Sequence, residues 1–136
     1  MPYKYDKDTP VLELKIKHPM SKEIKKVRCI LDTGAHRTTL PRDVIYGLGL
    51  ISGTHELVKD YFGEERWRSI YMANISIEGY RFSEMKVLLT NSEVGLIGRD
   101  ILNQWAILLD GKRKLFYIAD KVKDFGSCGF LKSKNV

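Results

Sequence analysis

The sequence predicts a mostly β fold with two short helices. Apolar residues alternate with charged residues across "VLELKIK" at 11–17, which is the period of a strand with one buried face. The later apolar runs are short, and glycine or charged turn residues bound most of them. Only two stretches, which begin at Pro41 and at Arg99, suit helical turns. These three observations are typical of a chain dominated by strands.

The first two predicted strands form a hairpin. The strand at 11–17 is followed by turn residues, "HPMSK" at 18–22. "EIKKVRCILD" at 23–32 then resumes as a strand whose later half is continuously apolar, as expected of a fully buried strand.

The first helix is expected directly after Leu40. Pro41 can open it, because a first helical turn does not need the N–H that proline lacks, and Asp43 suits the same end electrostatically. The helix should end within "GLGL" at 47–50.

The remaining chain is again mostly β. Strands are expected at 54–62, 66–79, 80–90, 94–98, 106–110 and 114–118. Turn signals lie at Gly63, Glu78–Gly79 and Gly111–Lys112, and 99–105 suits one or two helical turns. The tail at 119–136 lacks clear periodicity.

Composition limits the classes of protein. The 136 residues are 43% hydrophobic, which is enough for one ordinary core and therefore one domain. A net charge of +6 and a pI of about 9.3 could favour an acidic partner. However, the basic residues lie in short clusters, without zinc spacing, an RNA-binding aromatic motif or a basic recognition helix. This argues against nucleic acid as a partner.

The cysteines and histidines predict no cofactor. Cys29 and Cys128 match neither a disulfide framework nor a metal motif, and His18 and His55 have no partner at ligand spacing. Cys29 is expected to be a buried thiol. No leader opens the chain, and no apolar stretch approaches the roughly 20 residues that span a bilayer. We therefore expect no membrane partner, and a reducing, cytoplasmic compartment or release from a longer precursor.

In the stretch "CILDTGAHRTTL" at 29–40, an apolar strand ends directly at a carboxylate, Asp32. Such a carboxylate is costly to ionise unless hydrogen-bond donors surround it. Thr33 offers a hydroxyl, and Gly34 allows close approach of the backbone. The same three residues also suit an ordinary strand-ending turn, so the triplet alone leaves both interpretations open.

A second stretch makes the pattern specific. "ILDTGA" at 30–35 followed by "GLIGRDIL" at 95–102 resembles the retropepsin-like aspartic proteases, both the retroviral enzymes and their prokaryotic relatives. The resemblance covers about residues 10–118. It implies a single-lobe acid protease fold, closed and barrel-like, with a flap hairpin. The protease domain would occupy 1–118, leaving 119–136 as an extension that is either part of a dimer interface or flexible.

The resemblance also implies roles for particular residues. Asp32 would be catalytic, Thr33 would link two active-site loops, and Gly34 would bring an N–H to the carboxylate, with Ala35 in the same loop. Structural support behind the loop would come from Leu96, Ile97, Gly98, Arg99 and Asp100. The candidate flap residues are Tyr61, Phe62 and Gly63; the two aromatic residues could equally be core residues of the hairpin.

One position departs from the family pattern, and two tryptophans carry no signal of function. Many retroviral members have an acid at the position of His36, and it pairs with the arginine that corresponds to Arg99. Arg99 must therefore find a partner near Asp100 or at a backbone carbonyl, while His36 is expected to be a partly exposed loop residue. Trp67 and Trp105 are expected to be core aromatics.

Aspartic protease chemistry uses two carboxylates about 3 Å apart that share one proton. The chain has one Asp-Thr-Gly, so the second Asp32 must come from another copy across a two-fold axis. Two functions are weighed: a homodimeric aspartic endopeptidase acting on extended peptides, and a non-catalytic retropepsin-like dimerisation or peptide-binding module. The intact Asp-Thr-Gly-Ala favours the first, because a binding module gains nothing from two close carboxylates.

Overall fold

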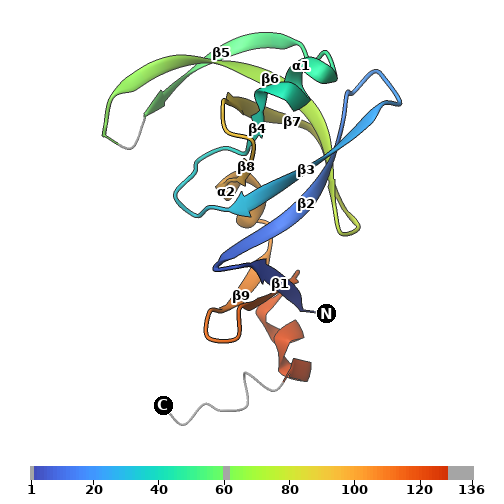
Figure 1. The fold of residues 1–136 in the computed structure, drawn as a ribbon, viewed down its shortest axis with the longest axis vertical. Coiled ribbons are helices and arrows are strands. Elements are labelled where there is room, and N and C mark those ends of the chain that lie inside the picture. Colours follow the sequence, from blue (N-terminus) through green and yellow to red (C-terminus); the bar gives the residue numbers. More distant parts are fainter. Residues whose placement is uncertain (1, 60–61, 129–136) are drawn as a thin grey trace.

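The computed structural model describes residues 2–59 and 62–128, and it confirms the mostly β fold with two short α-helices. Six strands close into a barrel, because β6 pairs with β7 on one side and with β2 on the other (Figure 1). In hydrogen-bonded order the barrel strands are β2 (Thr9–Lys17), β3 (Ile24–Leu31), β8 (Gly95–Ile97), β4 (Thr39–Pro41), β7 (Tyr80–Thr90) and β6 (Glu65–Ile77).

The predicted first hairpin is β2 with β3, paired from Val11 opposite Ile30 to Lys17 opposite Ile24. The alternation in β2 turns one face inward, where Leu12, Leu14 and Ile16 join the barrel core. Burial of this face stabilises the closed sheet through the hydrophobic effect.

Cys29 on β3 is the buried thiol that the sequence predicts. Burial raises the pKa of this thiol to about 12, because a thiolate would lose its hydration in the core. The group therefore stays protonated at neutral pH and acts as a small apolar core residue.

The two α-helices pack against barrel strands, α1 against β4 and β7 and α2 against β8. α1 (Arg42–Gly47) starts after Pro41 and buries Val44 and Ile45. α2 (Arg99–Leu102) starts after Gly98 and buries Ile101 and Leu102. These four side chains belong to the barrel core and anchor both helices to it.

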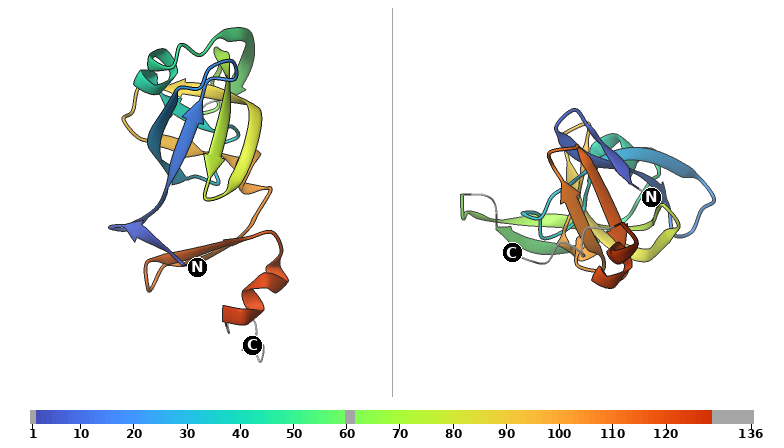
Figure 2. Two further views of the ribbon diagram at one scale, coloured as in Figure 1. Left: turned by 90° about the vertical axis from the view of Figure 1, so that its right-hand side faces the viewer. Right: turned by 90° about the horizontal axis from the view of Figure 1, so that it is seen from below.

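The hairpin of β5 (Ser52–Lys59) and the first half of β6 projects beyond the barrel (Figure 1; Figure 2). Leu57 and Trp67 lie opposite each other in this hairpin, and Trp67 is 71% exposed. The expectation that Trp67 is a core aromatic is therefore wrong, because this half of β6 extends beyond the barrel core. Trp105 does pack against the core, with its ring 5.2 Å from that of Tyr80.

A smaller part of the sheet lies beside the barrel and contains both ends of the described chain (Figure 2). Its strands are β1 (Tyr3–Asp6), β10 (Leu115–Ala119) and β9 (Ala106–Asp110), and a 3₁₀ helix, η1 (Val122–Cys128), follows. The ring of Tyr3 stacks on Phe116 at 5.3 Å, and Tyr5 lies 6.0 Å from the same ring. These aromatic contacts attach β1 to β10.

Candidate active site

The loop that contains Asp32 begins where β3 ends beside its parallel neighbour β8, with Leu31 opposite Ile97. The Asp32 N–H donates to the Ile97 carbonyl at 3.0 Å, which fixes the start of the loop. The Gly34 N–H donates to Asp32 Oδ1 at 2.9 Å, and the Ala35 N–H donates to the Asp32 carbonyl at 3.2 Å. The loop therefore turns tightly around a half-buried carboxylate that one backbone N–H already supports.

A glycine suits position 34 because of this close approach. A Cβ there would lie 3.2 Å from Asp32 Oδ1, a distance that side-chain carbons seldom reach. The N–H can contact the carboxylate because no side chain stands between them.

Arg99, the first residue of α2, holds the other side of the loop. Its N–H donates to the Ala35 carbonyl at 2.8 Å, and its Nη1 donates to the Thr33 carbonyl at 2.8 Å. Of the two partners expected for Arg99, the backbone carbonyl is the one observed. His36 is exposed, as expected.

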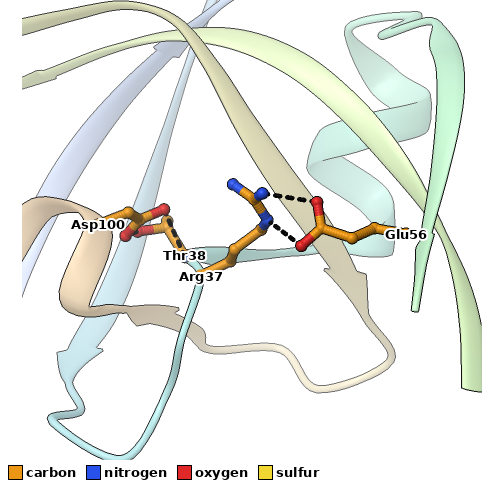
Figure 3. A network of polar contacts seen from close by, with 4 residues as sticks. All are labelled: Arg37, Thr38, Glu56 and Asp100. Atoms are coloured by element: carbon orange, nitrogen blue, oxygen red, sulfur yellow. Dashed lines mark hydrogen bonds and ion pairs between the residues drawn. The ribbon is translucent and has the colours of Figure 1, made fainter. Parts of the chain in front are cut away.

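Thr38 and Asp100 form a buried connection between this loop and α2 (Figure 3). Thr38 is fully buried, its N–H donates to Asp100 Oδ2 at 2.9 Å, and its hydroxyl donates to Asp100 Oδ1 at 2.8 Å. The same hydroxyl accepts the Gly98 N–H at 3.1 Å. All of these polar groups are satisfied, so the network holds the Asp32 loop, β8 and α2 in one arrangement.

An ion pair joins the loop to the projecting hairpin (Figure 3). Arg37 Nε donates to Glu56 Oε1 at 2.9 Å and Nη2 donates to Oε2 at 2.6 Å, a bidentate geometry. The Arg37 hydrogen bonds lower the pKa of Glu56. Because that pKa is lowered, the contribution of the pair to stability is present near neutral pH and is lost as pH falls through the lowered value.

A groove of about 540 Å³ lies between the loop and this hairpin. The loop contributes residues 34–37, β5 contributes residues 56–59, and β7 contributes residues 88–90. Gly34 lines the groove, and its N–H donates to the Asp32 carboxylate. The space has the size of a small-ligand site.

The hairpin tip is only partly described. Phe62 is 87% exposed, and Gly63 has φ +86°, a conformation that favours glycine in a tight turn. Tyr61 lies outside the described residues. The role of this tip as a flap stays a prediction.

Thr39 has a buried hydroxyl that finds no hydrogen-bond partner among the described residues, although the residue lines the groove. An unpaired buried hydroxyl costs about 1–3 kcal/mol. We expect Thr39→Val to raise the free energy of unfolding by about 1 kcal/mol, measured by urea denaturation. The matched control is Thr38→Val, which should lower that free energy because it removes the hydroxyl that donates to Asp100 Oδ1 and accepts the Gly98 N–H. Equal effects of the two substitutions would contradict this view of Thr39.

Two further properties concern the described part of the chain. It contains no helix that is long and apolar enough to cross a bilayer. Among the side chains that the structure describes, no three His, Cys, Asp or Glu residues come together as a group that could hold a metal ion.

The model of the retroviral aspartyl protease family matches residues 6–110. The chain therefore belongs to the retroviral aspartyl protease family. No curated protein matches the chain by sequence.

Solved structures agree with this family in fold. The EIAV protease in complex with the inhibitor HBY-793 is 21% identical and has a TM-score of 0.53, over 74% of this chain and 92% of that chain. The foamy viral protease-reverse transcriptase in complex with an RNA/DNA hybrid is 15% identical and has a TM-score of 0.55. That match covers 95% of this chain and 15% of the other. Family and fold together support an aspartic protease kind of function.

Proposed function

We propose that the chain is a homodimeric aspartic endopeptidase in which the two Asp32 carboxylates, one from each subunit, activate a water molecule. The observation that carries the proposal is the Asp32 loop. It presents a half-buried carboxylate beside a groove, and the Gly34 N–H supports it at 2.9 Å.

The proposed reaction needs only the two carboxylates and water. The ionised carboxylate takes a proton from the water, whose oxygen attacks the scissile carbonyl carbon. The protonated carboxylic acid donates its proton to the carbonyl oxygen. When the C–N bond breaks, the amine leaves with a proton from the first carboxyl group. One hydroxyl of the tetrahedral carbon returns its proton to the second carboxylate, and the carbon becomes that of a carboxylic acid.

The substrate would be an extended peptide that lies between the loop and the β5–β6 hairpin. The Arg37–Glu56 ion pair would hold these two walls at a fixed separation within each subunit. Homodimer formation follows from the single Asp-Thr-Gly, since one carboxylate cannot act as base and acid in the same step.

Subunit mixing tests the shared site. Wild-type protein is mixed with a threefold excess of Asp32→Asn, total protein is kept fixed, and subunit exchange is verified by mass. If pairing is random and each site needs both carboxylates, activity falls to about one sixteenth. Independent sites would retain about one quarter.

Activity proportional to the wild-type fraction after verified exchange would overturn the shared site. A covalently linked mixed dimer is the control for residual activity with one carboxylate. A protein that binds peptides and forms dimers but cleaves none would instead be a binding module.

A further inference from the structure

We propose that the groove beside Asp32 selects peptides with a carboxylate side chain, Asp or Glu, and that Arg37 binds this carboxylate. The inference rests on the proposed proteolytic function and adds a substrate class to it.

The charge of the groove favours an anionic ligand. Four side chains with fixed or nearly fixed positive charge line it, against one carboxylate, that of Glu56. The cations are Arg37, Lys59, Arg68 and Arg99. His36 also lines the groove. An acidic side chain would therefore meet a positive potential there.

The single acid of the groove is already fully used. Both Glu56 oxygens accept hydrogen bonds from Arg37, so the carboxylate has little capacity left to attract a basic side chain of a substrate. Arg37 uses only Nε and Nη2 for this pair. Among the described residues its third nitrogen, Nη1, has no hydrogen-bond partner, and in Figure 3 it points away from Glu56. The Nη1 group of this guanidinium is thus an available donor for a substrate carboxylate.

The cations are held in place before any ligand binds. Glu56 fixes the Arg37 guanidinium, and the Arg37 side chain remains 21% exposed. Arg68 Nη2 donates to the Leu89 carbonyl at 2.6 Å, and Arg99 Nη1 donates to the Thr33 carbonyl. Carbonyl partners fix these side chains without neutralising them. A substrate carboxylate therefore finds a prearranged positive site.

The proposed two-fold axis would place one such groove on each side of the scissile bond. The preference should therefore appear both before and after the cleaved bond in a peptide library.

The test compares matched peptides that differ only in Glu against Gln at one position, scanned on both sides of the scissile bond. At about pH 6 we expect kcat/KM to be about tenfold higher for Glu at the position that contacts Arg37. The ratio should approach one as the pH falls below about 4, where the substrate carboxyl becomes neutral. Added salt should reduce it.

The matched variants remove one ion pair each and keep the net charge. Arg37→Gln with Glu56→Gln should reduce the Glu/Gln ratio to about twofold or less, because the remaining cations still contribute a weaker field. Arg28→Gln with Asp6→Asn removes an exposed pair that does not line this groove, and should leave the ratio unchanged. Circular dichroism and thermal unfolding verify that both variants are folded.

Each outcome decides the proposal. Cleavage with equal kcat/KM for every Glu/Gln pair overturns the selectivity and leaves the proteolytic function standing. A ratio that persists in the Arg37/Glu56 variant overturns the role of Arg37. If that variant does not fold, the pH and salt dependence of the wild-type ratio decide the question. No cleavage of any peptide by verified dimers counts against the proposed function itself.

Discussion

Asp32→Asn is expected to abolish peptide cleavage while it leaves the fold intact. Asparagine retains an Oδ1 that can accept the Gly34 N–H, and the position is half-buried, so little packing changes. The amide cannot take a proton from water or return one to the leaving amine at accessible pH. We expect kcat/KM to fall about a thousandfold or more, measured with a peptide that the wild type cleaves.

The wild type should show a bell-shaped pH profile with its optimum below neutral, because the carboxyl pair must hold one proton. Asp8→Asn is the matched control, since Asp8 is an exposed aspartate whose oxygen also accepts a local hydrogen bond. It should retain full activity. Full activity in Asp32→Asn, or a flat pH profile in the wild type, would remove Asp32 from the mechanism.

The parts of the fold that the sequence predicted are those with a local signal. The alternation in β2 and the turn at Glu78–Gly79 depend on neighbours in the chain. Both turn residues have positive φ, 47° and 90°, as a two-residue hairpin turn requires. The start of α1 after Pro41 has the same local character.

The elements that were missed depend on distant partners. β4 has only three residues, and it is a strand because Thr39 lies between Leu88 of β7 and Leu96 of β8. β1 is ordered by pairing with β10, more than 100 residues away, where Tyr3 lies opposite Phe116. The pattern of apolar and polar residues within one segment does not predict pairing with a distant strand. The exposure of Trp67 was missed for a related reason, since the extent of the barrel decides which half of β6 is covered.

The polar contacts around the candidate site also depend on residues that are distant in the sequence. The sequence places Asp32, Thr33 and Gly34 in a recognisable run, but it gives no sign that Arg37 pairs with Glu56. That contact exists because the fold brings Glu56 of β5 to face Arg37 of the loop (Figure 3). The link between Thr38 and Asp100 spans 62 positions and has only one local hint, the nearness of each residue to a motif. Motifs thus identified the backbone of the site, whereas its side-chain chemistry required the fold.

Gly98→Ala is expected to be the most destabilising small substitution near the site. A Cβ at this position would lie 2.5 Å from the Arg37 carbonyl carbon, 2.7 Å from its oxygen and 2.8 Å from the Thr38 nitrogen. All three atoms belong to the backbone, so no side-chain rotation can relieve the overlap. Overpacking of this kind costs about 1–3 kcal/mol, and backbone contacts place it near the upper end.

We expect the midpoint of thermal unfolding to fall by on the order of 10 °C in Gly98→Ala. Gly111→Ala is the matched control, because a Cβ at Gly111 meets nothing within 4 Å, and it should change the midpoint little. The backbone displacement that relieves the overlap should also move Arg37 and Thr38 away from Gly98. It should therefore loosen the hydrogen bonds that hold the Asp32 loop against α2. Activity should therefore fall even at temperatures where the variant is folded. A folded Gly98→Ala protein with wild-type stability and activity would mean that the close packing of β8 against this loop does not shape the site.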